Sequence, residues 1–202
     1  MPSPDRTRQR REAILDAALE VFSAKGYHGA GIADIAAVVG MWHGTFYRYF
    51  KNKRDIFTAL LGEATQRIAK ALHGLPPTTN SLEEYEQQLN GIAAGIFNVF
   101  SADPRLGRVV LFEAPGVDPE LHEQFQSTLG VVASMTRAYL DNGVKKGFLR
   151  ADMDTQLIAR AVNAVIFEGM REISLSKDPQ AESQRWIRQG VPQMLYGVAA
   201  SR

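Results

Sequence analysis

The chain has 202 residues, of which 45% are apolar and 22% are charged, the balance of an ordinary globular protein. It contains no cysteine, which excludes disulfides and thiolate chemistry, and no apolar run reaches the roughly 18 residues that a membrane span needs. Because residues 1–11 are charged and lack the apolar segment of a signal peptide, we expect a cytoplasmic protein with no membrane partner.

The overall charge of +1 is unevenly distributed, since residues 1–54 carry +4 and residues 55–202 carry −3. A basic N-terminal part suits a polyanionic partner such as nucleic acid. The alternative is a solvated basic tail, because four of the nine basic residues in this part are arginines within residues 6–11.

Apolar residues that recur every three or four positions predict helices in the N-terminal third of the chain. We expect four of them, over residues 7–25, 32–39, 42–50 and 53–72. Gly26 and Gly40 are suitable helix ends, because glycine readily takes the left-handed conformation that closes a helix. Asn52 is a suitable N-cap for the fourth helix.

Longer helices follow a linker-like stretch, HGLPPTTNS, at residues 73–81. Asp-Pro pairs begin at residues 103, 118 and 178, and such pairs are typical helix starts because Asp caps the helix and Pro fits its first position. Together with the apolar spacing they predict helices over residues 82–99, 103–114, 118–146, 154–175 and 178–198. Pro192 should kink or divide the last of these. No stretch has the pattern of a strand, so the sequence predicts an all-α fold.

The second and third predicted helices meet at a tight glycine-containing turn, the pattern of a helix-turn-helix. On a helical wheel, Phe46, Tyr49 and Phe50 share one side of the third helix and should face the core. Gly44 lies opposite, so that face can approach another surface closely. Its neighbours Thr45, Tyr47 and Arg48 offer hydrogen-bond donors that suit phosphates and base edges. A small helical bundle with surface aromatics is the alternative interpretation.

The stretch ILDAALEVFSAKGYHGAGIADIAAVVGMWHGTFYRYFKNKRDIF resembles the N-terminal domain of the TetR family of transcriptional regulators. The match covers about residues 10–60, and its most specific part is G-T-F-Y-x-Y-F-x-x-K, from Gly44 to Lys53. The resemblance implies a three-helix helix-turn-helix domain over residues 1–52. A connecting helix, about 53–72, would join it to an effector-binding and dimerisation domain within residues 53–202. It also implies a homodimer that represses transcription until a small molecule lowers its affinity for DNA.

Carried over residue by residue, the resemblance implies base or phosphate contacts for Thr45 and Tyr47 and a phosphate contact for Lys53. His43 occupies the position that usually discriminates between sequences. Two residues depart from the family pattern, because Gly31 and Trp42 stand where side-chain caps are common. Gly31 then has only its backbone N–H for a phosphate, and Trp42 would pack on the DNA backbone or a thymine methyl, or simply shield the turn. The expected DNA-contact set is Gly31, Trp42, His43, Gly44, Thr45, Tyr47, Arg48 and Lys53.

The predicted helix over residues 154–175 is apolar on two sides, so it lies between a core and either a ligand cavity or a partner subunit. The effector is expected to be small and largely apolar, with Asn163 and Tyr139 as polar anchors, and plain core packing is the alternative. The predicted pocket comprises Phe97, Phe100, Phe112, Phe125, Leu129, Met135, Tyr139, Asn163 and Phe167. The predicted dimer seam, from the last two helices, comprises Gly169, Trp186, Ile187, Gly190, Val191, Met194 and Leu195.

Nothing in the sequence indicates an enzyme, a metal site or a cofactor. The four histidines lack metal-ligand spacing, no serine has the context of a nucleophile elbow, and glycine-rich phosphate loops are absent. The expected partners are a near-palindromic double-stranded DNA operator, a second copy of the chain and a small apolar effector. The alternatives are an effector-independent structural or cell-division factor on DNA and, less favoured, an enzyme.

Overall fold

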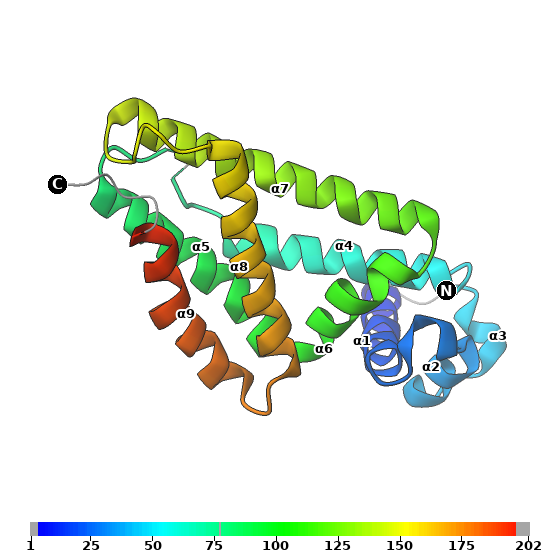
Figure 1. Ribbon diagram of the computed structural model, residues 1–202. Coiled ribbons are helices and arrows are strands. Elements are labelled where there is room, and N and C mark those ends of the chain that lie inside the picture. The colour runs from blue at the N-terminus through cyan, green and yellow to red at the C-terminus, as the bar shows by residue number, and fades with distance from the viewer. Residues whose placement is uncertain (1–3, 77, 197–202) are drawn as a thin grey trace.

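The computed structural model describes residues 4–76 and 78–196, and these form helices and turns with no extended strand, which confirms the all-α prediction. Three helices at one end of the molecule form the head, and the remaining helices form a longer body (Figure 1). Helix α4, Lys53–Ala71, begins at the head and runs along the body.

The head contains α1, Pro4–Gly29, α2, Ile32–Val39, and α3, His43–Phe46. Gly26 interrupts α1 with a φ of 72°, the left-handed conformation expected at that glycine. The predicted third helix was too long at its C-terminal end. After Phe46 the chain continues as turns, held by hydrogen bonds from the Arg48 N–H to the Thr45 carbonyl and from the Tyr49 N–H to the Phe46 carbonyl.

One hydrophobic core joins the head to the part of the body nearest to it. Phe46 and Phe50 anchor the α3 segment on Phe22 of α1 and Phe57 of α4 within this core. The same core includes buried residues from beyond position 100, namely Leu106, Val109, Ala114, Val117 and Leu121. The head therefore packs on the body through apolar contacts as well as through the continuous α4.

Residues 78–81, at the end of the linker-like stretch, are packed against the body. Thr79 is buried, and its carbonyl accepts hydrogen bonds from Asn142 Nδ2 at 2.9 Å and from Lys146 Nζ at 2.8 Å. Ser81 then caps α5, Leu82–Ala102, by accepting the N–H of Glu84. Residues 78–81 thus lead into α5 in a defined conformation.

The chain is helical over residues 104–116, in agreement with the helix predicted over 103–114, but it is not a single α-helix, because three short elements of different type follow one another. They are α6, Pro104–Gly107, the π-helical turn η1, Arg108–Glu113, and the 3₁₀ turn η2, Ala114–Gly116. Asp103 caps α6 as its Asp-Pro pair predicts. A π turn widens the backbone, so side chains leave η1 in directions that an α-helix would not give them.

Three long helices complete the body: α7, Pro119–Lys146, α8, Thr155–Leu175, and α9, Pro179–Tyr196. Asp118 and Asp154 cap α7 and α8, and Gly147 ends α7 with a φ of 81°. Pro192 does not divide α9, contrary to one of the predicted outcomes. The predicted end of that helix, at residue 198, lies outside the described residues.

Candidate nucleic-acid interface and ligand cavity

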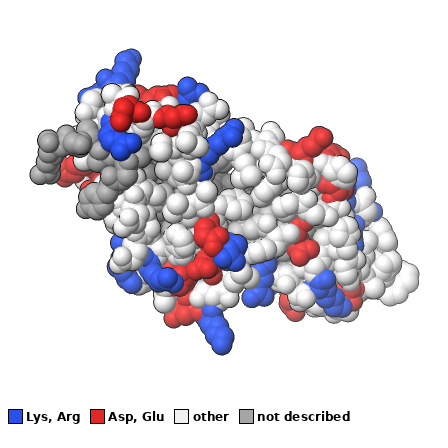
Figure 2. Space-filling model, in the orientation of Figure 1, with Lys and Arg blue, Asp and Glu red and all other residues white. Residues whose placement is uncertain are grey.

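The exposed side chains of the α3 segment gather at the tip of the head. Trp42 is 80% exposed and Tyr47 is 50% exposed, and His43 and Arg48 are exposed beside them. The tip is formed mainly by uncharged atoms, with basic side chains nearby (Figure 2). Thr45 is half-buried at its edge. This tip therefore offers aromatic rings and hydrogen-bonding groups on an anchored helical turn.

Trp42 covers the glycine that was expected to lie open at the centre of this face. A Cβ added to Gly44 would overlap the six-membered ring of Trp42. Trp42 is also the N-cap of α3 and makes no side-chain cap hydrogen bond. The ring, rather than bare backbone, is thus the surface that a partner would meet at Gly44 in this conformation.

The backbone N–H of Gly31 already has a partner inside the head. It donates to Asp34 Oδ2 at 2.8 Å, and the other carboxylate oxygen of Asp34 accepts from Lys25 Nζ at 2.8 Å. The Lys25 ammonium and the Gly31 N–H together lower the pKa of Asp34. An anion near Gly31 would therefore compete with an ionised carboxylate for this N–H.

Lys53 is held at the C-terminal end of α1. Its ammonium donates to the carbonyl oxygens of Tyr27 at 2.7 Å and Ala30 at 2.9 Å, and it lies 4.3 Å from the centre of the Tyr27 ring. These carbonyls lie at the C-terminal end of α1, where a positive charge is favourable. Two of the three N–H groups of Lys53 are thus occupied within the head.

Hydrogen bonds join the head to η1 and η2. The backbone N–H of Tyr27 donates to Glu113 Oε2 at 2.7 Å, and His28 Nε2 lies 3.0 Å from the Gly116 carbonyl. The side chain of Glu113 thus joins η1 to the C-terminal end of α1. Glu113 is the last residue of the π turn η1, and sequence periodicity does not indicate such a turn, so no pattern in the sequence predicted this contact.

Ion pairs join the first turn of α4 to the start of α7. Arg54 donates to Asp118 Oδ2 at 2.7 Å and to Glu120 Oε2 at 2.9 Å. The guanidinium of Arg54 lowers the pKa of Asp118, with help from the Leu121 N–H. Asp118 therefore both caps α7 and binds α4.

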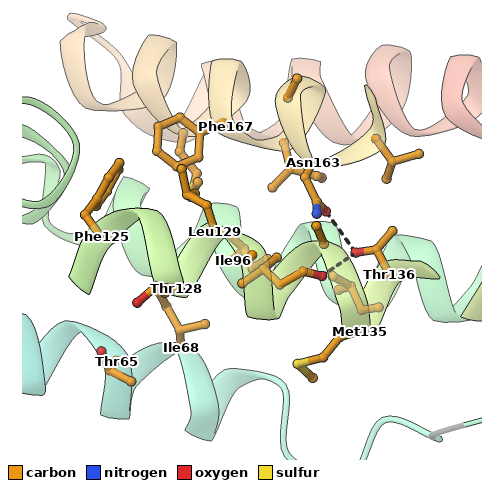
Figure 3. A pocket seen from close by; sticks show the side chains of 18 of the residues that line it. Thr65, Ile68, Ile96, Phe125, Thr128, Leu129, Met135, Thr136, Asn163 and Phe167 are labelled. Carbon is orange, nitrogen blue, oxygen red and sulfur yellow. Dashed lines mark hydrogen bonds between the residues drawn. The ribbon is translucent and has the colours of Figure 1, made fainter. Parts of the chain in front are cut away.

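The body contains a cavity of about 1260 Å³ between α4, α5, η1, α7 and α8. This exceeds the roughly 300–1,000 Å³ of ordinary ligand sites. Seven of the nine predicted pocket residues line it: Phe100, Phe125, Leu129, Met135, Tyr139, Asn163 and Phe167. Figure 3 shows several of them pointing from α7 and α8 toward Ile68 and Thr65 of α4 and Ile96 of α5, lining residues that the prediction did not include.

Two predicted pocket residues lie elsewhere. Phe97 is buried between α5, α8 and α9, where its ring contacts Trp186 at 6.4 Å between centroids and its edge approaches Gly169. Phe112 is 43% exposed on η1 and does not line the cavity. The periodic pattern identified both as large apolar residues but did not determine which side of the helix faced the cavity.

The walls of the cavity are largely apolar, and Asn163 is one of the polar groups on them. Its Oδ1 accepts a hydrogen bond of 2.9 Å from Thr136 Oγ1, as Figure 3 shows, and its Nδ2 is buried without a protein partner. Phe125 and Phe167 meet edge to face nearby, at 5.9 Å between centroids. Burial raises the pKa of Tyr85, which also lines the cavity, to about 12, so its hydroxyl is neutral at pH 7.

Part of the predicted dimer seam packs inside the chain itself. Val191, Met194 and Leu195 are buried in the core formed with α5 and α8, and Gly169 is covered by Phe97 and Trp186. They are therefore not available as a surface for a second copy. The half-buried members of the predicted seam are Trp186, Ile187 and Gly190.

Searches of the described residues found neither a cluster of three or more potential metal ligands nor a helix long and apolar enough to cross a membrane.

Comparison with known proteins gives consistent similarities. The model for "Bacterial regulatory proteins, tetR family" matches residues 14–60. The fatty acid metabolism regulator protein of Bacillus subtilis is 26% identical over 155 residues, which are 77% of this chain and 78% of that protein. The transcriptional regulator BetI of Escherichia coli is 33% identical over 93 residues, 44% of this chain and 45% of BetI.

Solved structures share the whole fold. The fatty acid degradation regulator FadR from Bacillus halodurans superposes with a TM-score of 0.75 at 22% identity, covering 98% of this chain and 97% of that chain. FadR from Bacillus subtilis, solved in complex with stearoyl-CoA, has a TM-score of 0.72 at 22% identity and covers 92% of this chain and 98% of its own.

Proposed function

Because the chain belongs to the tetR family of bacterial regulatory proteins, we propose that it binds a near-palindromic operator as a homodimer and represses transcription until an effector binds. The exposed α3 segment carries this proposal, since its aromatic and hydrogen-bonding groups sit on a buried platform of Phe46 and Phe50. A regulator that acts on the chromosome works in the cytoplasm, so we retain that location as part of the proposal. Residues 1–52 would act as the DNA-binding domain and residues 53–202 as the effector-binding and dimerisation domain.

At the operator, we assign base discrimination to His43 and base or phosphate contacts to Tyr47, Thr45 and Arg48. The ring of Trp42 would meet the sugar-phosphate backbone or a thymine methyl over Gly44, because it is the most exposed aromatic group at the tip. Lys53 retains one N–H for a phosphate after its two carbonyl contacts. A phosphate near Gly31 would have to displace the Asp34 carboxylate.

We propose that the dimer seam lies on the outer face of α8 and the half-buried part of α9. Leu157 is 61% exposed, and Ala161 and Val165 follow it at helical spacing, with Ile187 and Gly190 on the neighbouring helix. Such an apolar row on a surface helix is typical of an interface. Ala161→Glu should therefore shift sedimentation toward a monomer, whereas Ala69→Glu, the same change at an exposed alanine of α4, should not.

The effector is proposed to be largely apolar and elongated, because the cavity is large and follows α7 from Leu121 to Tyr139. The helix rises about 27 Å between these two residues. A similar regulator was solved with stearoyl-CoA, and a similar sequence is a fatty acid metabolism regulator. Stearoyl-CoA is therefore the first effector to test.

Two routes connect the cavity to the head. Thr58 and Leu61 of α4 line the cavity, and α4 begins at the head. Val110 and Leu111 of η1 also line it, while Glu113 of the same turn binds the head. An effector that displaces either element would change the spacing of the two α3 segments in a dimer. A coupling of about 1–3 kcal/mol, or 5–150-fold in DNA affinity, is the usual range.

Selection of binding sites from random duplex DNA tests the operator proposal. We expect a near-palindrome whose half-sites are about 34 Å apart, or a multiple of this, and an affinity that falls steeply with salt. His43→Ala should change the selected sequence, whereas Lys51→Ala, at an exposed cation of the same head, should not. A monomer that gives no enriched sequence would contradict the proposal, and operator binding that no ligand alters would support an effector-independent factor.

A further inference from the structure

Asn163 presents a buried hydrogen-bond donor to the cavity. Its Oδ1 already accepts the Thr136 hydroxyl at 2.9 Å, and among the described residues its buried Nδ2 has no partner. Figure 3 shows the amide of Asn163 extending from α8 into the space between α8 and α7. A buried N–H without an acceptor is unfavourable, so a ligand that supplies an acceptor there gains affinity.

Thr136 binds the oxygen end of the Asn163 amide in this structure. Its hydroxyl oxygen lies 2.9 Å from Asn163 Oδ1 and 3.1 Å from the Val132 carbonyl, and the hydroxyl has one proton to share between them. When the proton points at Oδ1, the oxygen end of the amide is fixed on Thr136. The nitrogen end then remains for the ligand.

The wall of the cavity differs on the two sides of Asn163 along α8. Arg160, one turn earlier, lies at the exposed edge of the cavity, and none of the ion pairs among the described residues involves it. Arg137, the other cation of the wall, pairs with Asp141 at 3.4 Å. Phe167, one turn later than Asn163, packs on Phe125, and these two rings form an apolar part of the wall beside the polar lining residues Gln124 and Glu168.

We propose that Asn163 Nδ2 donates a hydrogen bond to the carbonyl oxygen of an acyl effector. The anionic end of the effector lies toward Arg160, and its hydrocarbon chain runs past Phe125 and Phe167 toward η1. This inference rests on the proposed function and specifies its effector. The shared chemistry is a long acyl chain with an acceptor oxygen and a negative charge at one end, and both a free fatty acid and an acyl thioester of coenzyme A have it.

The test compares two probes that differ only at the carbonyl, stearoyl-CoA and its thioether analogue S-octadecyl-CoA. Titration calorimetry on the full-length protein should give about fivefold tighter binding of the thioester, the factor expected for one hydrogen bond. Asn163→Leu and Asn163→Ala should each reduce this preference to about onefold. Thr128→Val, at an exposed threonine that lines the cavity on α7, is the matched control and should preserve the preference.

A second arm identifies the source of the acyl group. If stearate binds as tightly as stearoyl-CoA and Arg160→Gln weakens both alike, the ligand is the fatty acid. If stearoyl-CoA binds more tightly than stearate, the ligand is the thioester. Equal binding of thioester and thioether, or a preference that survives both Asn163 variants, overturns the carbonyl assignment while leaving the proposed function intact. Failure of all three probes to bind overturns the acyl effector itself.

Discussion

Replacing Lys53 with Met tests whether the contacts of this residue with the end of α1 stabilise the protein. Met keeps most of the aliphatic stem but removes the ammonium that bonds the Tyr27 and Ala30 carbonyls and lies over the Tyr27 ring. Each hydrogen bond contributes about 1 kcal/mol at a half-buried site, and the cation–π contact about 0.5 kcal/mol. The sum, about 2–3 kcal/mol, should lower the midpoint of thermal unfolding by about 5–10 °C for a chain of this size.

Differential scanning calorimetry measures this shift, and Lys51→Met is the control. Lys51 is exposed two residues before Lys53, in the loop that precedes α4. Its replacement removes the same charge and should have little effect on the midpoint. A midpoint for Lys53→Met that equals that of the control would refute the reasoning, because the two carbonyl contacts would then contribute nothing.

The same variant tests the phosphate contact of Lys53 independently. If the remaining N–H meets one phosphate in each half-site, the slope of log affinity against log salt should fall by about 1.8 for the dimer. Operator variants should all weaken alike, since a phosphate contact does not depend on the base sequence. An unchanged slope with a lowered midpoint would leave Lys53 as a structural residue only.

Three further predictions concern separate parts of the molecule. Gly44→Ala should weaken operator binding in fluorescence anisotropy more than it does in a Trp42→Ala background, because the added Cβ displaces the ring. Arg54 lowers the pKa of Asp118, so the stability from this pair is complete above about pH 4 and is lost as the pH falls through the lower folded value. Asp118→Asn should remove that acid dependence from urea unfolding curves. Phe112→Ala should leave stearoyl-CoA affinity within about twofold, because Phe112 lies outside the cavity.

Local signals in the sequence predicted most helix boundaries correctly. The side chains of Asp118 and Asp154 cap helices, and Gly147 closes one, because each of these roles depends on a few neighbouring residues. The π turn η1 had no such signal. Its residues have the composition of an ordinary apolar helix, and the wider backbone depends on packing against the head and the cavity.

Sequence periodicity was least informative about what each helix face meets. It showed that α9 has an apolar side, but not that Val191 and Leu195 pack on the core of their own chain. Likewise, Asn163 stood out as a lone polar residue, whereas its partner Thr136 lies 27 residues away on another helix. Contacts between distant segments depend on the tertiary arrangement of the helices, which the periodicity of the sequence does not reveal.

The apolar core shared by the head and the nearest part of the body limits how this DNA-binding specificity can be transferred to another regulator. A chimera joined at residue 52 would separate Phe22 and Phe46 from Leu106 and Val109, which complete their core. The transplanted fragment would expose that surface or meet a foreign one of different shape. A working chimera should therefore carry residues 53–64 and 104–121 along with the N-terminal segment, because both stretches contribute to this core, so a single crossover point cannot exchange the specificity intact.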